Sequence, residues 1–229
     1  MKILALETSA KAVSAAVTED GKVLASGYQD TGLTHSRTLM PIVESILKNT
    51  NLSMKDIDAV AVAVGPGSFT GIRIGVAAAK GLAFAVDKPT IGVSTLAAMA
   101  RNVAFCDGPI ICAMDARRQQ VYNALFEAKD GKLKRLTEDR AIALADLLEE
   151  IKGDPRPKMV VGDGGRLCCD YLTANGLPCR LAPAQLVMQN AMSVALEAEL
   201  LAAAGKLVSA QALEPVYLRP PHADLPNRK

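Results

Sequence analysis

The two halves of this chain repeat one order of predicted elements, and this repeat restricts the fold more than any other feature. In each half, apolar periodicity and turn signals predict strand, strand, strand, helix, strand, helix, strand, helix. Both halves carry an Asp-Gly-Lys hairpin turn, at 20–22 and at 130–132, because Asp-Gly tolerates positive φ. The duplication predicts an α/β protein of two lobes, each a mixed β-sheet flanked by helices.

The first half is predicted to contain strands at 2–6, 13–18, 23–28, 59–64 and 90–93, with helices at about 39–47, from the Gly-rich segment to about 86, and after the capping residue Ser94. The order restarts after Asp107-Gly108-Pro109, with strands at 110–114, 121–127, 159–161 and near 178–181, a helix ending at Ile151, another after the strand at 159–161, and a long last helix to Gly205. We expect an N-terminal lobe at 1–106 and a smaller C-terminal lobe with an extended tail at 107–229.

Composition argues against a protein that binds nucleic acid alone. The formal net charge is +2 over 229 residues, with no Trp, four Tyr and four Phe. Independent nucleic-acid binders show a concentrated basic face, and single-strand platforms need aromatic rings on which bases stack.

The cysteines and the apolar runs indicate a cytoplasmic protein. Five cysteines form no Cys-x-x-Cys pair, which suits a reducing compartment and fits neither a disulfide framework nor a zinc site. No signal-peptide pattern opens the chain, and Lys80 interrupts the run from Ile74 to Val86 before it reaches membrane-spanning length. Adjacent Cys168 and Cys169 cannot both face one partner on a helix, so we expect one buried and one partly exposed thiol.

The most specific segment runs from Gly65 to Gly75, between a predicted strand and a predicted helix. Glycines and a helix N-terminus suit a phosphate or anion loop, but no Gly-Lys-Ser/Thr follows as in a Walker A motif. The alternative, which the residue types favour, is a tight turn needed only for packing. The structural loop expected there is Gly65, Pro66, Gly67, Ser68, Phe69 and Thr70.

The duplicated hairpin lobe resembles the actin, Hsp70 and sugar-kinase superfamily, in which acids at the ends of the first strands handle a magnesium-nucleotide. The matching positions hold Glu7 and Asp115, and Asp163 follows a later strand. Nucleotide-using relatives place Gly after the acid, where backbone approaches phosphate, whereas Thr8 and Ala116 stand here. The three acids are therefore candidates for a degenerate cleft only, and we expect no bound cofactor.

The Gly65–Gly75 segment, His35-Ser36, Pro41, Asp115-Ala116-Arg117 and the run from Glu214 to Arg219 together resemble the TsaB (YeaZ) family of tRNA threonylcarbamoyladenosine biosynthesis proteins. The resemblance covers residues 1–219. This chain departs from the family in carrying Gln119-Gln120 where Gly-Glu is usual, and Glu7 where many relatives have Asp. Gln119 weakens any anion role for that turn.

The resemblance implies a catalytic paralogue, TsaD, that holds a metal through His-x-x-x-His. The matching positions here are Thr95 and Met99, whose hydroxyl and thioether cannot replace two imidazoles. The chain has only His35 and His222, which leaves Ser and Cys nucleophiles without a positioned base. We expect no metal and no catalytic residue, and interpret His35 as a surface or capping residue.

The function implied is a non-catalytic subunit that binds TsaD and supports transfer of threonylcarbamoyl to the adenosine next to the anticodon. Further implied partners are the ATPase TsaE, a second copy in a homodimer, and tRNA through the complex alone. Three alternatives stay open: a metallopeptidase, an actin-like ATP-dependent phosphotransferase, and a homodimeric interaction module unrelated to tRNA. The basic, Pro-spaced tail (Arg219, His222, Arg228, Lys229) is predicted to be extended and solvated, or to touch tRNA or a partner.

The first two helices of the N-terminal lobe are the predicted partner surface, because they carry more apolar width than one sheet needs and small residues four apart. Ordinary lobe core is the alternative. The predicted surface residues are Leu39, Ile42, Val43, Ile46, Gly71, Gly75, Val76, Ala79, Lys80 and Ala83.

Overall fold

The computed structural model describes residues 1–219; His222, Arg228 and Lys229 of the predicted basic tail lie outside them. The first sheet has the order β3-β2-β1-β4-β5. Its strands are β1 (Lys2–Glu7), β2 (Val13–Glu19), β3 (Lys22–Gln29), β4 (Ala59–Gly65) and β5 (Thr90–Ser94). The β1–β2–β3 meander is antiparallel, whereas β4 and β5 join in parallel, so the sheet is mixed as predicted.

The second sheet repeats this topology, with the order β8-β7-β6-β10-β11. Its strands are β6 (Gly108–Asp115), β7 (Gln120–Lys129), β8 (Lys132–Arg135), β10 (Lys158–Val161) and β11 (Cys179–Leu181). The equivalent strands pair with the same polarity, which confirms the duplication. The short strand β9 (Arg140–Ala143) pairs with the start of β7 and was not predicted from the sequence.

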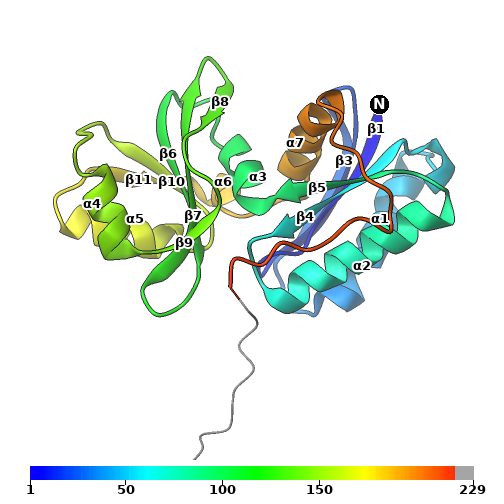
Figure 1. Ribbon diagram of the computed structural model, residues 1–229. Coiled ribbons are helices and arrows are strands. Elements are labelled where there is room, and N and C mark those ends of the chain that lie inside the picture. The colour runs from blue at the N-terminus through cyan, green and yellow to red at the C-terminus, as the bar shows by residue number, and fades with distance from the viewer. Residues whose placement is uncertain (220–229) are drawn as a thin grey trace, which may run out of the picture.

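Helices cover both faces of each sheet (Figure 1). Helices α1 (His35–Asn49) and α2 (Phe69–Ala85) lie on the outer face of the first sheet, and α4 (Leu144–Ile151) and α5 (Gly165–Ala174) on that of the second. Helices α3 (Thr95–Arg101) and α7 (Ala191–Ala203) lie between the sheets; η1 (Met54–Asp56) and α6 (Ala184–Val187) are short connections. Ser94 caps α3 as predicted, its hydroxyl accepting a hydrogen bond from the Ala97 N–H at 3.1 Å.

The last helix does not stay in the second lobe. Residues 107–229 were predicted to form the C-terminal lobe and its extended tail, but α7 lies against β1 and β2 of the first sheet. Ala195 and Ala198 of α7 share one buried cluster with Ala5, Ala16 and Ala61 of the sheet. Small side chains on both surfaces allow this close approach. The first lobe is therefore completed by residues far beyond 106.

Along residues 1–219, no helix is both long and apolar enough to cross a lipid bilayer.

Candidate functional site

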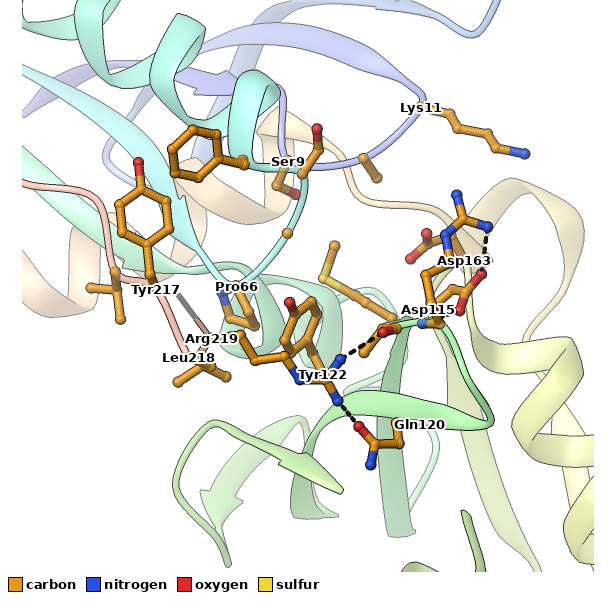
Figure 2. Close-up of a pocket in the computed structure, with 18 of the residues that line it drawn as sticks. Ser9, Lys11, Pro66, Asp115, Gln120, Tyr122, Asp163, Tyr217, Leu218 and Arg219 are labelled. Atoms are coloured by element: carbon orange, nitrogen blue, oxygen red, sulfur yellow. Dashed lines mark hydrogen bonds and ion pairs between the residues drawn. The ribbon is translucent and has the colours of Figure 1, made fainter. Parts of the chain in front are cut away.

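A cavity of about 1140 Å³ lies between the lobes (Figure 2). It is walled by the turn after β1, the Gly-Pro-Gly loop, the β6–β7 turn and the C-terminal segment of the described chain. The charged and aromatic lining residues are Lys11, Asp30, Phe69, Asp115, Arg117, Arg118, Tyr122, Asp163, Tyr217 and Arg219. Three of the eight aromatic residues of the chain thus converge on this one site.

Glu7, the first candidate acid, lies behind the cavity wall rather than in it. The side chain is fully buried, and Oε1 accepts a hydrogen bond from the Ser9 N–H at 2.5 Å. Oε2 has no hydrogen-bond partner among the described residues. Burial raises the pKa of Glu7 to about 7, and the nearby charge of Asp163 acts in the same direction. A ligand in the cavity does not reach this carboxyl group without a rearrangement.

Asp115 and Asp163 do line the cavity, but both already have partners within the chain. Asp115 accepts hydrogen bonds from the Arg117 N–H at 2.7 Å and from its guanidinium at 3.3 Å. Asp163 accepts one from the Gln189 amide at 2.9 Å. Burial raises the pKa of Asp163 above its usual range, and the Asp115 charge adds to the effect. The structure therefore brings two of the three predicted acids to one wall.

The β6–β7 turn has an unusual backbone. Arg117, Arg118 and Gln119 adopt φ of +66°, +53° and +55°, in the left-handed region that side chains disfavour. Such residues cost about 1 kcal/mol each relative to the right-handed conformation. Ala116 directly follows Asp115, and the three residues with positive φ that come next all have long side chains.

The Gly-Pro-Gly loop is packed against the turn that follows β1. A Cβ on Gly67 would lie 2.4 Å from the Ser9 carbonyl oxygen, and one on Gly71 would lie 2.1 Å from that of Thr8. The Ser68 N–H donates to the Ser9 carbonyl at 2.7 Å, and the Thr8 hydroxyl donates to the Gly71 carbonyl at 2.7 Å. These close approaches explain the glycines without an anion, as the tight-turn interpretation requires.

Thr95 and Met99, at the positions of the paralogue's histidines, are buried core residues of α3. Within residues 1–219, no group of three or more His, Cys, Asp or Glu side chains is arranged to hold a metal ion. Half-buried His35 begins α1, and its Nε2 lies 2.7 Å from the Ala10 carbonyl oxygen. Cys168 and Cys169 are both buried, contrary to the expectation that one would be partly exposed.

Nine of the ten residues of the predicted partner surface are buried in the first lobe. Leu39, Ile42, Val43, Ile46, Val76, Ala79 and Ala83 form one core cluster with the sheet. Buried Gly71 and Gly75 face the β1 turn, since a Cβ on Gly75 would lie 2.3 Å from the Thr8 hydroxyl oxygen. The small residues therefore allow α2 to approach its own sheet. Only Lys80 is half-exposed.

The solvent side of α2 carries a second set of small residues that the predicted partner surface did not include. Ala77, Gly81 and Ala85 are exposed at four-residue intervals. Beside them Phe84 is 71% exposed, at a hollow of about 250 Å³ completed by Ala210 and Gln211. This α2 outer face, defined by Ala77, Gly81, Phe84 and Ala85, is apolar and lacks a covering element among the described residues. The equal spacing of its small residues was the available signal.

The repeated mixed sheets, the helical layers between and outside them, and the interlobe cavity define a two-lobed actin-like α/β protein. The ethanolamine utilization protein EutJ from Carboxydothermus hydrogenoformans shares this fold at a TM-score of 0.50 and 12% identity, over 86% of this chain and 90% of that one. A crystal structure from Pseudomonas aeruginosa, described as a protein with similarity to peptidase YeaZ, is much closer. It has a TM-score of 0.83 and 28% identity, over 95% of this chain and 99% of that one.

Within this class of two-lobed actin-like proteins, the sequences of known proteins identify the family. A family model described as TsaD, tRNA N6-adenosine threonylcarbamoyltransferase, matches residues 29–204. The Escherichia coli tRNA threonylcarbamoyladenosine biosynthesis protein TsaB is 34% identical over 226 residues, covering 96% of this chain and 95% of that protein. The Bacillus subtilis protein of the same name is 40% identical over 162 residues, 71% of each chain. This chain belongs to the TsaB (YeaZ) family of tRNA threonylcarbamoyladenosine biosynthesis proteins.

Proposed function

We propose that this protein is a non-catalytic subunit of the tRNA threonylcarbamoyladenosine machinery, and that it binds and supports the catalytic subunit TsaD. TsaD transfers threonylcarbamoyl to the adenosine next to the anticodon. Membership of the TsaB family supports the pathway, since its relatives are named for this biosynthesis. TsaE joins the complex, tRNA contacts the protein only within it, and a homodimer uses the same surface as TsaD.

The observation that carries partner binding is the α2 outer face. An exposed stripe of Ala77, Gly81 and Ala85 lets a second helix backbone approach closely, by the same geometry that brings helices together in membranes. Phe84 adds a large apolar ring beside the stripe, and exposed aromatic anchors of this kind supply much of the binding energy at interfaces. The site thus shifts by half a helix turn from the predicted residues while staying on one of the two predicted helices.

The free face of α1 is different in character. Ser36, Arg37, Glu44, Ser45 and Lys48 are exposed there, so this helix offers a polar rim rather than an apolar anchor. A polar rim around an apolar centre is the usual anatomy of a protein–protein interface.

The interlobe cavity supports a non-catalytic role. Its candidate acids either lie behind the wall, as Glu7 does, or already accept hydrogen bonds within the chain, as Asp115 and Asp163 do. A carboxylate that binds a magnesium-nucleotide has to offer oxygens to the metal or to its water shell. No group in the described chain combines a nucleophile with an adjacent imidazole base, since His35 contacts only a backbone carbonyl by a side-chain hydrogen bond.

Nucleoside analysis of tRNA tests the pathway. Depletion of the protein from its own cells should lower threonylcarbamoyladenosine, and re-expression should restore it. Unchanged modification after complete depletion would refute the assignment. Metal analysis and ATP turnover by the purified protein separate the two enzymatic alternatives, because stoichiometric zinc or iron with peptidase activity, or hydrolysis lost in Asp115→Asn, would support them instead.

A matched pair of substitutions tests the surface. Phe84→Asp should weaken binding to TsaD by about 30-fold or more, the effect typical of losing an aromatic anchor, while the variant stays folded. Phe105→Asp is the control, because Phe105 is 67% exposed but lies on the loop after α3. Calorimetry with TsaD and sedimentation of the free protein measure the two associations. Equal binding by both variants would place the interface elsewhere.

A further inference from the structure

The C-terminal strap, residues 208–219, touches the proposed partner surface only through Ala210 and Gln211, which complete the hollow beside Phe84. The rest of the strap has no role in the proposed function, although its end carries a motif of the family resemblance. It leaves α7 and returns across the first lobe (Figure 1). Val208 exchanges backbone hydrogen bonds with Thr90 of β5, and the Lys80 ammonium donates to the carbonyl oxygens of Gln211 and Leu213 at 3.0 and 3.1 Å. Leu213 is buried in the core of the first lobe. The strap is therefore docked on this lobe along most of its length.

The docking continues to Tyr217. The Val216 N–H donates to the Val64 carbonyl at 2.8 Å, and a Cβ on Gly65 would lie 2.3 Å from the Val216 carbonyl oxygen. Gly65 is thus needed where the strap crosses the end of β4. The Tyr217 ring lies 5.0 Å from that of Phe69, and its hydroxyl accepts a hydrogen bond from Arg73 Nε at 2.9 Å.

Two residues later the strap contacts the other lobe. The Arg219 guanidinium donates to the Ala116 carbonyl at 2.7 Å and to the Gln120 side-chain oxygen, and lies 5.6 Å from the centre of the Tyr122 ring. Figure 2 shows Tyr217 on one wall of the cavity and Arg219 reaching the opposite wall. A guanidinium group is well suited to joining the two lobes, because its planar donors can bind two acceptors at once.

The two acceptors flank the left-handed turn. Ala116 precedes and Gln120 follows the three residues with positive φ. The Ala116 N–H donates to the Gln120 carbonyl at 3.0 Å, so both ends of the turn are also joined by backbone. A backbone in a disfavoured region persists only where its surroundings hold it. Arg219 supplies such a restraint from outside the second lobe.

We propose that Arg219 is a latch that fastens the second lobe to the strap and thereby holds the two lobes in one relative orientation across the cavity. The chain itself bridges the cavity from one wall to the other. The latch makes the protein a rigid support rather than a hinged one, and it braces the Arg117–Gln119 turn. This inference concerns the isolated protein, so its test does not depend on TsaD.

Amide hydrogen exchange, resolved by residue, tests the latch. In Arg219→Ala, the Ala116 and Gln120 amides should exchange at least about tenfold faster than in the wild type, since hydrogen bonds to a charged group are lost at both ends of the turn. The Val216 amide, on the first-lobe side, should keep its protection. Small-angle scattering should show a larger radius of gyration as the lobes gain freedom.

Lys11→Ala is the matched control, because Lys11 lines the same cavity and its loss changes the charge equally. It should leave the Ala116 and Gln120 amides unchanged. A thermal melt establishes that each variant is folded, and Arg219→Lys, which keeps the charge but not the fork, should give intermediate exchange. Wild-type exchange in Arg219→Ala, or an equal rise in Lys11→Ala, would overturn the proposal.

Discussion

The buried carboxyl group of Glu7 gives a quantitative prediction about stability and pH. Its pKa is raised from the ordinary value of 4.5 to about 7, chiefly because burial disfavours the charged form. The folded state therefore keeps a proton that the unfolded chain loses above its own pKa. The stabilisation from this proton is fully present below pH 4.5, declines as pH rises, and is lost once pH passes about 7.

The size of this stability change follows from the shift in the pKa of Glu7 between the unfolded and the folded state. A rise in the pKa from 4.5 to about 7 means that the free energy of unfolding falls by about 3 kcal/mol once Glu7 is ionised, at about 1.4 kcal/mol per pKa unit. Linkage places about 2 kcal/mol of that loss between about pH 5.5 and about pH 8. Glu7→Gln removes the titration, because the amide matches the shape of the protonated acid and its carbonyl oxygen still accepts the Ser9 N–H.

Urea unfolding of the wild type and Glu7→Gln at several pH values measures this difference. Between about pH 5.5 and about pH 8, the free energy of unfolding of the wild type should fall by about 2 kcal/mol relative to that of the variant. The variant should be the more stable protein at pH 8. Glu44→Gln, on the exposed face of α1, is the control and should follow the wild type. Parallel profiles for wild type and Glu7→Gln would refute a proton bound at Glu7. Any pH dependence of stability that remains in Glu7→Gln is expected to come from Asp163, because burial raises the pKa of that carboxyl group as well.

Three further outcomes follow from the packing of α2. Gly71→Ala should destabilise the fold by about 2 kcal/mol or more in urea unfolding, because its Cβ would lie 2.1 Å from the Thr8 carbonyl oxygen and the backbone has to move. Gly81→Ala, on the same helix with no atom within 4 Å of the added Cβ, should instead stabilise it by about 0.5–1 kcal/mol, and a loss of stability would contradict an open outer face. Val76→Arg should unfold the first lobe, as seen in a thermal melt, rather than only abolish binding, since it buries an unpaired charge. A folded variant would contradict the burial of Val76.

Local sequence was sufficient for the architecture. Apolar alternation, Asp-Gly turns and the Ser94 cap act over a few residues, so the element order and the repeat could be predicted along the chain. The repeat in turn implied two lobes of one topology, and the observed sheets share it. The short strand β9 escaped because four residues without alternation carry too little periodic signal.

Orientation and long-range contact needed the tertiary structure. Helix α2 is apolar nearly all round, and small residues recur at four-residue intervals on two sides, so its sequence does not reveal whether Gly71 or Gly81 faces the sheet. The sheet decides, because Thr8 leaves no room for a Cβ at Gly71. The same holds for Arg219, whose partner at Ala116 stands 103 residues away in sequence. The periodicity of apolar residues indicates which residues prefer burial, but only the folded chain determines which residues each of them contacts.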